Sequence, residues 1–369
     1  MKKYFAVLLL AVCMAVSASA LDDVSAQSAF LMSKDGTVMW EKNPDEKLEP
    51  ASVTKIMTML LTAEAIENGR IAESDMVSAS AHAVSMGGSQ IWLKEGEQMT
   101  VADLLKSVAV VSANDSAVAL AEYIAGSEEA FVDMMNERAK ELGMENTHFS
   151  NCNGLPIDNH YTTARDIALM SAEAMKHDII FKNTGIWMDY IRDGQSVLVN
   201  TNKLLRSYPG MTGLKTGMTA SAGYCLSSTA SRDGLDLIAV VMKCATADDR
   251  SKDITNLLNY GFANYTAMDI SESLEFDNIE VELGKEASIT PKALVTDKIT
   301  VSRADAENLT FEVNLPQKLE APVEKDEKIG TVTVKTAEKE IKTFDIVSEQ
   351  ECKRLNLFEI YKMLLKKII

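Results

Sequence analysis

Two β-hairpin patterns enclose a run of amphipathic helical patterns, and this order constrains the fold more than any other feature of the chain. Segments of strand-forming residues flank Asp35-Gly36 in the first hairpin and Asp233-Gly234 in the second, and both dipeptides favour a primed turn. The helical patterns between them cover residues 52–68, 101–111, 115–124 and 128–142. Strands on both sides of a helical stretch predict an α+β fold, in which one antiparallel sheet is flanked by helices.

A different pattern begins near Phe276. Short segments that alternate apolar and polar residues follow one another, with Pro291, Pro316 and Pro322 between them. This spacing is typical of a small all-β domain. We therefore predict a first domain over residues 21–270 and a small all-β domain over residues 275–348, and both fall near the usual domain sizes.

The N-terminal segment has the three parts of an export signal. Lys2 and Lys3 are followed by an apolar stretch over residues 5–16 and by small residues up to Ala20. The apolar stretch is too short for a stable transmembrane anchor. A buried first strand is the alternative interpretation. We expect residues 1–20 to be a signal peptide that is cleaved after Ala20, so that the protein acts outside the cytoplasmic membrane.

The segment 349–369 ends in an apolar stripe at helical spacing. Basic residues are concentrated in its second part, where Glu359 is the only acid after residue 352. A basic amphipathic helix of this kind suits an anionic membrane surface, and we expect it to hold the protein at the outer face of the cytoplasmic membrane. A helix docked on its own domain is the alternative. The stripe consists of Leu357, Phe358, Tyr361, Leu364, Leu365 and Ile368.

Charge and cysteine usage exclude several classes of protein. The chain has 37 Lys and Arg against 54 Asp and Glu, a formal net charge of −17, whereas nucleic-acid binding needs cations to neutralise phosphates. No C-x-x-C pair occurs, and the 4 histidines form no H-E-x-x-H motif, so no metal site is expected. The pattern leaves open whether any cysteines beyond the signal pair with one another; these are Cys152, Cys225, Cys244 and Cys352.

The first chemical motif is Ser52-Val53-Thr54-Lys55, at the start of a predicted helix. Residues three apart share a helix face, so the hydroxyl of Ser52 and the amine of Lys55 can meet. The free N–H groups of a helix N-terminus also suit a developing oxyanion. Lys55 can act as a base only when neutral, which requires a pKa lowered by burial or by a second cation.

Two further motifs are weak when taken singly. Ser112-Ala113-Asn114 follows an apolar run and resembles an ordinary helix cap. Lys215-Thr216-Gly217 reads as part of a strand in which Gly217 permits a close backbone approach. In a regular strand Lys215 and Thr216 point to opposite faces, so a bend or bulge would help both to reach one site.

The three motifs together, in this order, resemble the S-x-x-K, S-x-N and K-T-G set of β-lactamases and penicillin-binding proteins. The whole mature chain is similar to the low-molecular-weight penicillin-binding proteins that are D-alanyl-D-alanine carboxypeptidases. This resemblance implies a β-lactamase/transpeptidase-like first domain, followed by the small all-β domain and the terminal helix. The supporting segments are residues 50–58, 93–97, 142–149 and 223–226.

The resemblance implies catalytic roles for the first two motifs. Ser52 would be the nucleophile and Lys55 its base, with Lys215 helping to keep Lys55 neutral. Ser112 would relay a proton toward the leaving amine, and Asn114 would bind the substrate amide. His148 is interpreted as structural.

The resemblance also implies a substrate-binding role for the third motif and its surroundings. Lys215, Thr216 and Arg250 would hold the terminal carboxylate, although Arg250 could instead be a surface residue beside two aspartates. The main-chain N–H groups of Ser52 and Met218 would form the oxyanion hole. Ala113, where the family usually has glycine, and Met218, where it has a more polar residue, depart from the pattern. The binding set is Asn114, Lys215, Thr216, Gly217, Met218 and Arg250.

The implied reaction removes the terminal D-alanine from peptidoglycan stem peptides ending in D-Ala-D-Ala, through an acylated Ser52 that β-lactams would also form. Neither a metal nor an organic cofactor is implied. A class A-like β-lactamase and a non-catalytic penicillin-binding sensor are the alternatives. No E-x-x-L-N motif follows Ser112 at the expected spacing, which disfavours the lactamase, and a sensor would have no use for Lys55. The sequence leaves the oligomeric state and the stem-peptide preference open.

Overall fold

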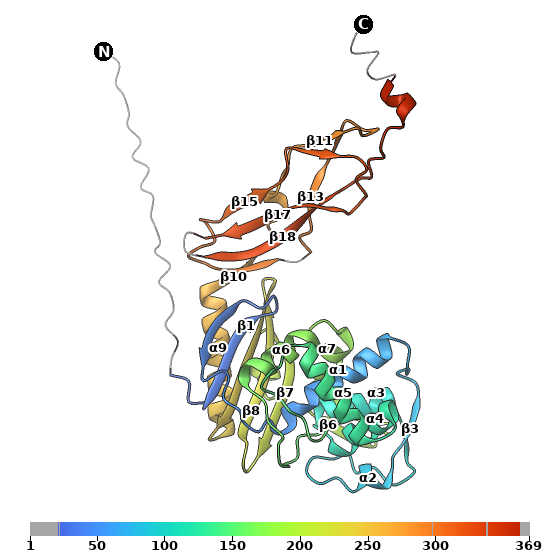
Figure 1. The fold of residues 1–369 in the computed structure, drawn as a ribbon. Helices are drawn as coiled ribbons and strands as arrows, with labels where there is room; N and C mark the ends of the chain where they lie inside the picture. Colours follow the sequence, from blue (N-terminus) through green and yellow to red (C-terminus); the bar gives the residue numbers. More distant parts are fainter. Residues whose placement is uncertain (1–20, 22, 297, 337–338, 362–369) are drawn as a thin grey trace, which may run out of the picture. The chain divides into compact units, whose positions relative to one another are not determined.

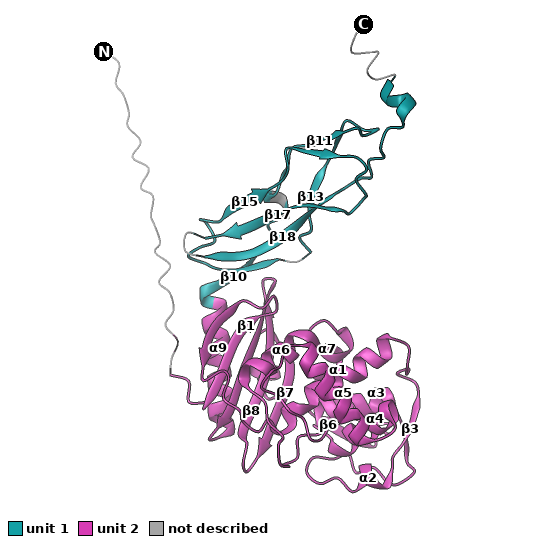
Figure 2. Ribbon diagram, viewed as in Figure 1, with its two compact units in different colours: residues 1–20, 263–369 teal, residues 21–262 magenta. Residues whose placement is uncertain are grey.

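The computed structural model describes residues 21, 23–296, 298–336 and 339–361. They divide into two compact units, one over Leu21–Phe262 and one that begins at Ala263 (Figure 2). The sequence suggests a boundary at residue 270 instead. The difference arises because β10 (Tyr265–Met268) pairs with β14 (Ile299–Ser302), a strand of the second unit.

The first unit is built on one antiparallel sheet whose strand order is β2-β1-β9-β8-β7 (Figure 1). The first strand of the chain pairs with the last strand of this unit, with Phe30 opposite Val240. The two hairpin patterns therefore form a single sheet, as predicted. Its strands are β1 (Ser28–Ser33), β2 (Val38–Lys42), β7 (Met211–Thr219), β8 (Gly223–Arg232) and β9 (Leu235–Cys244).

The two hairpin turns differ. Asp233 and Gly234 both have positive φ, 52° and 81°, as the predicted primed turn requires. The prediction of a primed turn at Asp35-Gly36 is wrong, because of these two residues only Gly36 has positive φ, at 90°. The turn is instead closed by a hydrogen bond from the Gly36 N–H to the carbonyl oxygen of Ser33. The carboxylate of Asp35 stabilises this turn by accepting a hydrogen bond from the Thr37 N–H at 3.2 Å.

Both faces of the sheet are buried. Phe30 and Met32 of β1 belong to the large apolar core shared with the helices. Leu31, which points the other way, lies against α9 (Ala247–Asn264), where Gly261 leaves room for it. Figure 1 shows α9 on one side of the sheet and the other labelled helices on the opposite side.

The helical layer contains helices in each of the four predicted segments, in the predicted order. Thr100 and Ser127 accept N-terminal capping hydrogen bonds, and Gly126 ends a helix at a φ of 89°. The first predicted helix starts later than residue 52, because residues 51–54 form the 3-10 turn η1 (Ala51–Thr54). The helices are α1 (Lys55–Glu67), α2 (Ala81–Val84), α3 (Val101–Val110), α4 (Asn114–Ala125), α5 (Glu128–Glu141), α6 (Ala164–Ala174), α7 (Asp178–Thr184) and α8 (Leu204–Ser207).

Small strands complete the two units. In the first unit β3 (Met76–Ser78) pairs with β4 (Gln98–Thr100), and β5 (Met188–Ile191) pairs with β6 (Ser196–Val199). The described part of the second unit is rich in strands, with one 3-10 turn, η2 (Ser271–Ser273). Its remaining strands are β11 (Ile279–Glu282), β12 (Ser288–Ile289), β13 (Pro291–Ala293), β15 (Thr310–Asn314), β16 (Lys318–Glu320), β17 (Lys328–Lys335) and β18 (Glu340–Ser348).

The terminal helix begins later than residue 349. Cys352 and Arg354 form bridges to other segments of the second unit, so the chain is extended there. The helix begins after Asn356, where Asn356 and Glu359 cap each other at 2.8 and 2.9 Å. Residues 362–369, including the rest of the predicted stripe, and the predicted signal at 1–20 lie outside the described residues.

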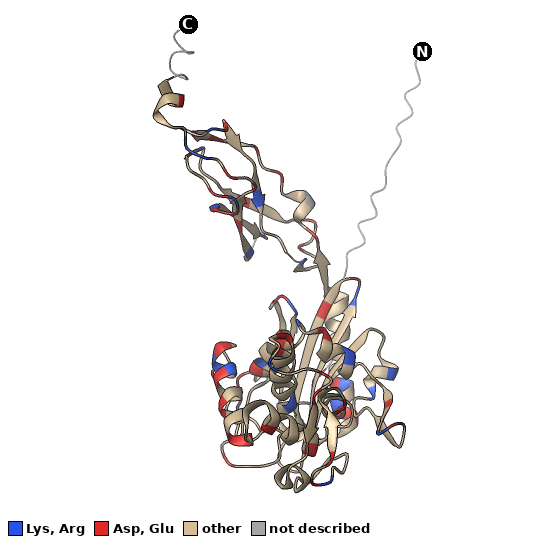
Figure 3. Ribbon diagram, turned by 90° about the vertical axis from the view of Figure 1, so that its right-hand side faces the viewer, with Lys and Arg blue, Asp and Glu red and all other residues tan. Residues whose placement is uncertain are grey.

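Charged residues are interspersed through both units in the described structure (Figure 3). Basic and acidic side chains commonly pair at the surface, as Arg165 does with Glu41 and Asp45. Among the described residues, no helix is both long enough and apolar enough to cross a membrane.

Candidate active site

Ser52 lies in a turn against which two glycine-containing segments pack closely. Ala51, just before it, has a φ of +48°. A Cβ on Gly154 would lie 1.9 Å from the Ala51 carbonyl oxygen, and one on Gly217 would lie 2.7 Å from the Pro50 carbonyl oxygen. Only glycine permits these approaches. The K-T-G strand and the segment around Gly154 are thereby brought against η1, the turn that carries Ser52 and leads into α1.

Lys55 is fully buried, and its amine has three oxygen partners. Nζ lies 3.1 Å from Ser52 Oγ, 2.5 Å from Asn114 Oδ1 and 2.6 Å from the carbonyl oxygen of Asn153. The amide and carbonyl oxygens can only accept hydrogen bonds. A neutral amine would therefore donate to these two oxygens, and its lone pair would face the only partner that can donate, the hydroxyl of Ser52.

Burial favours that neutral form. Desolvation lowers the pKa of Lys55 to about 7, against smaller opposing effects of Cys152 and Asp115. Burial also lowers the pKa of Lys215 well below its usual range, and repulsion from Lys55 and Arg250 lowers it further. The site thus holds cationic groups close together in a dry environment, which is how lysine amines become bases.

The second motif contacts Lys55 through Asn114. Ser112 has a φ of +64° and is 4% exposed, and its Oγ has no hydrogen-bond partner among the described residues. The side chain of Asn114 bridges Lys55 Nζ and the carbonyl oxygen of Gly87, to which its Nδ2 donates at 2.6 Å. Ser112 therefore has an unused hydroxyl, and Asn114 is held from two sides.

The third motif lies on β7, opposite β8. Lys215 and Thr216 are both buried, at 1% and 6% exposure. Lys215 Nζ donates to the carbonyl oxygen of Thr216 at 3.0 Å, and the Thr216 hydroxyl lies 2.6 Å from that of Thr201. The only irregularity in the β7–β8 pairing precedes the motif, between Met211 and Gly213, so the expected bulge is absent from the motif itself.

Arg250 and Met218 flank this strand. Arg250 lies in the first part of α9, is half-buried, and makes no ion pair within the described structure, despite its neighbouring aspartates. Its guanidinium is 5.8 Å from the centroid of the Tyr224 ring, its buried Nε has no partner there, and burial lowers its pKa. The side chain of Met218 is 57% exposed. Arg250 is thus a cation without a carboxylate partner, near Lys215.

Both units of the chain match known protein families. Residues 14–246 match the D-alanyl-D-alanine carboxypeptidase family of peptidases, and residues 270–354 match the C-terminal domain of penicillin-binding protein 5. The chain belongs to the D-alanyl-D-alanine carboxypeptidase family.

Relatives of this serine peptidase family resemble the chain over most of its length. The D-alanyl-D-alanine carboxypeptidase DacF of Bacillus subtilis is 40% identical, over 91% of this chain and 88% of that protein. Penicillin-binding protein 5 of Haemophilus influenzae has a solved structure that matches with a TM-score of 0.81 and 30% identity, over 91% of this chain and all of that one. Penicillin-binding protein D2 of Listeria monocytogenes, solved in an ampicillin-bound form, is 32% identical over 65% of this chain and 98% of its own, with a TM-score of 0.60.

The sequence predicted the three motifs of the candidate site but not the buried residues that surround them. Asn153 supplies a main-chain carbonyl to Lys55, and carbonyls carry no residue signature. Asp115 is fully buried, and its carboxylate accepts hydrogen bonds from the N–H groups of Ile91 and Leu93. The Asn153-Gly154 dipeptide, a common turn signal, could have pointed to the tight turn.

One cluster outside the motifs has the composition of a metal site. Candidate ligand atoms of Glu64, Glu173 and His177 lie within 4.8 Å of one another. Arg138 already pairs with both carboxylates, at 2.8 and 3.0 Å. A cation there would face the guanidinium, so the cluster is better described as an ion-pair network that joins α1, α5 and α6.

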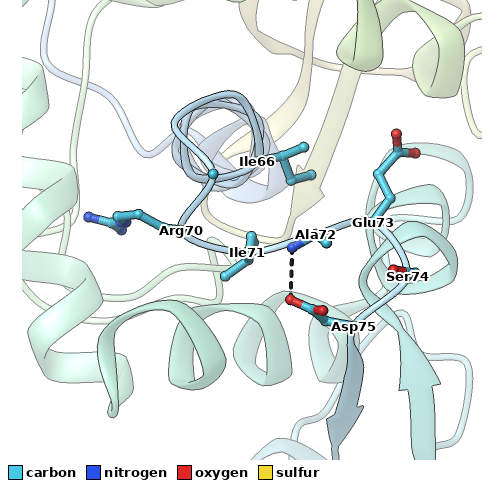
Figure 4. Close-up of a pocket in the computed structure, with 8 residues that line it drawn as sticks. Ile66, Arg70, Ile71, Ala72, Glu73, Ser74 and Asp75 are labelled. Atoms are coloured by element: carbon cyan, nitrogen blue, oxygen red, sulfur yellow. Dashed lines mark hydrogen bonds between the residues drawn. The ribbon is translucent and has the colours of Figure 1, made fainter.

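A surface depression, shown in Figure 4, lies at the far end of α1 from the site. The segment that lines it is held by a hydrogen bond from the Ala72 N–H to Asp75 Oδ2 at 2.7 Å. Ile66 is eleven residues beyond Lys55 on α1, about 16 Å along the helix axis. The depression is therefore separate from the carboxypeptidase-family site.

Proposed function

We propose that this protein removes the terminal D-alanine from peptidoglycan stem peptides ending in D-Ala-D-Ala, with Ser52 as the nucleophile and Lys55 as its base. The observation that supports this most strongly is the set of partners around Lys55 Nζ: two oxygens that only accept hydrogen bonds, and the hydroxyl of Ser52. A neutral Lys55 can accept the proton of Ser52 as Oγ attacks the carbonyl carbon. The C–O bond formed is that of an ester between Ser52 and the penultimate D-alanine.

The leaving D-alanine takes a proton as the peptide C–N bond breaks. The unpaired hydroxyl of Ser112 supports a relay from Lys55 to that nitrogen. The N–H groups of Ser52 and Met218 would stabilise the tetrahedral oxyanion, and Asn114 would bind the substrate amide. Water then hydrolyses the ester, which releases the shortened peptide and regenerates Ser52.

The cations beside β7 support binding of the substrate's terminal carboxylate. Lys215 is buried and Arg250 is half-buried, and Arg250 makes no ion pair among the described residues. Thr216 offers a hydroxyl next to them, and Gly217 keeps the strand close to Ser52. A carboxylate would satisfy the guanidinium and repay part of the cost of burying it.

The β-lactamase and sensor alternatives are less consistent with the site. The segment that covers Lys55 contributes a carbonyl, that of Asn153, where a lactamase of the class A type would use a glutamate to activate water. A sensor would not need an amine positioned against the nucleophile. We expect β-lactams to acylate Ser52 and to remain bound longer than a lactamase would allow.

We also infer that the protein is exported and acts at the outer face of the cytoplasmic membrane. The sequence pattern of residues 1–20 supports export. In the described part of the terminal helix, Leu357, Phe358 and Tyr361 are 87%, 75% and 62% exposed. These apolar side chains, with the basic residues that follow, support attachment to an anionic bilayer surface.

A single pair of rates tests the proposed function. D-alanine release from a D-Ala-D-Ala peptide is measured beside the lifetime of the penicilloyl adduct. We expect release together with a long-lived adduct. Rapid turnover of the adduct without release would favour a β-lactamase, and a stable adduct without release would favour a sensor.

A further inference from the structure

His160 lies buried behind the turn that carries Ser52, and the mechanism above gives it no role. The residue is 5% exposed and packs edge-on against Phe149, with ring centroids 5.9 Å apart. Both ring nitrogens have partners: Nδ1 lies 3.0 Å from the main-chain nitrogen of Ser150, and Nε2 lies 2.7 Å from Thr54 Oγ1. The ring therefore connects two segments that meet at the site.

The direction of these hydrogen bonds follows from their partners. The N–H of Ser150 can only donate, so Nδ1 is an acceptor and a neutral ring carries its proton on Nε2. Nε2–H then donates to the hydroxyl of Thr54, which in turn donates to the carbonyl oxygen of Ala51 at 2.8 Å. A continuous chain of donors thus runs from His160 to Ala51, and such chains reinforce each bond within them.

The last carbonyl of this chain belongs to the same peptide plane as the N–H of Ser52. Because that plane is rigid, fixing the Ala51 carbonyl fixes the direction of the Ser52 N–H on its other side. Ala51 needs this support, since its φ of +48° is unfavourable for an alanine. The same N–H is the one assigned above to the oxyanion hole.

We propose that His160 is a positioning residue for acylation, which fixes the Ser52 N–H through Thr54 and the Ala51 carbonyl. The inference rests on the proposed acylation of Ser52. The contact at Nδ1 of His160 also supports this role. It holds Ser150, and the segment that follows Ser150 brings the Asn153 carbonyl to Lys55. His160 therefore helps to position both the Ser52 N–H and the Asn153 carbonyl that contacts Lys55.

The environment of His160 keeps the ring neutral, as the donor chain requires. Burial, together with smaller electrostatic effects of His148 and Lys55, lowers its pKa to about 4. A protonated ring would present Nδ1–H to the N–H of Ser150, and two donors would then face each other across 3.0 Å.

The test compares variants by the rate constant for acylation with a fluorescent penicillin and by the affinity of the preceding non-covalent complex. His160→Phe keeps the ring but removes both nitrogens, and Thr54→Val removes the hydroxyl. We expect each to lower the acylation rate constant about 10- to 100-fold with little change in the affinity. The double variant should lose little more than either single one, because both break the same chain.

Two conservative variants and a control make the result specific. His160→Gln can still donate to Thr54, and Thr54→Ser keeps the hydroxyl, so both should acylate at close to the wild-type rate. His148→Gln changes an exposed neighbouring histidine and should have no effect. If His160→Phe does not fold, the comparison of Thr54→Val with Thr54→Ser decides the outcome.

Acylation of His160→Phe or Thr54→Val at the wild-type rate would overturn the proposal. A wild-type protein that releases no D-alanine would instead refute the proposed function, so the two failures are distinguishable.

Discussion

At the scale of single residues, the proposed mechanism depends on the neutral form of Lys55. Within the described part of the chain, Lys55 has no carboxylate partner at hydrogen-bonding distance, and its three partners are neutral oxygens. Burial penalises the ammonium form more than Cys152 and Asp115 favour it, which is why the pKa of Lys55 falls to about 7. A surface lysine is protonated at neutral pH, whereas a pKa of about 7 leaves much of Lys55 neutral there and able to act as a base.

The acylation rate of the wild-type protein should therefore rise with pH. A base whose pKa is lowered to about 7 is protonated and inactive below that value and neutral above it. We expect the rate constant for penicillin acylation to fall about tenfold per pH unit well below pH 7, and to level off above it. A rate that is constant between about pH 5 and 9 would show that Lys55 is not the titrating base.

Lys55→Arg provides the matched variant. Arginine keeps its proton throughout this range and cannot act as a base, although it preserves length and charge. The variant should acylate roughly 10²- to 10⁴-fold more slowly, with no recovery at high pH.

At the scale of elements, the site forms where a turn, a helix start and a strand meet. The sequence allowed the sheet, its helical cover and the three motifs to be predicted, because periodicity and short motifs are local signals. The hydroxyl of Ser112 is buried without a partner among the described residues, and the amine of Lys215 is buried on β7. The contacts of Asn153, His160 and Asp115 were not predictable, since they depend on main-chain groups brought together by distant segments.

Gly154 tests how closely those segments must approach. In Gly154→Ala, the new Cβ would lie 1.9 Å from the Ala51 carbonyl oxygen, so the turn that carries Ser52 must move. We expect a loss of acylation of roughly 10²-fold or more, because displacement by about 1 Å is costly in an active site. The variant should also be destabilised by more than the 1–3 kcal/mol or so of a strained φ alone. Acylation rate and unfolding by denaturant are measured together.

Gly143→Ala is the control for that substitution. Gly143 also has positive φ, 74°, but nothing lies within 4 Å of the position of its Cβ. It should lose roughly 1 kcal/mol of stability and keep its acylation rate. If Gly154→Ala behaves like Gly143→Ala, the close approach does not shape the site.

At the scale of the whole molecule, the chain combines an acidic body with a basic terminal segment. The formal net charge of −17 disfavours nucleic acid but says little about a membrane, because the charges are unevenly distributed along the chain. The catalytic motifs all lie in Leu21–Phe262, whereas the exposed apolar side chains of the terminal helix belong to the second unit. The proposed catalysis and the proposed membrane attachment should therefore be separable.

A mature chain that ends at Leu355 tests this separation. It retains the bridges of Cys352 and Arg354 but lacks the helix. We expect D-alanine release within about twofold of the full mature chain and loss of binding to vesicles that contain anionic lipid. Leu357→Ser with Phe358→Ser, in the full chain, should weaken binding in the same way. Undiminished vesicle binding by either variant would place the attachment elsewhere.

The identity of the nucleophile is the central claim, and locating the covalent adduct tests it most directly. The wild-type protein and Ser52→Ala are incubated briefly with a penicillin and analysed by intact and peptide mass spectrometry. We predict one penicilloyl group in the wild type, on the peptide that contains Ser52, and none in Ser52→Ala. An adduct on another residue, or labelling that persists in Ser52→Ala, would contradict the assignment of Ser52 as the nucleophile.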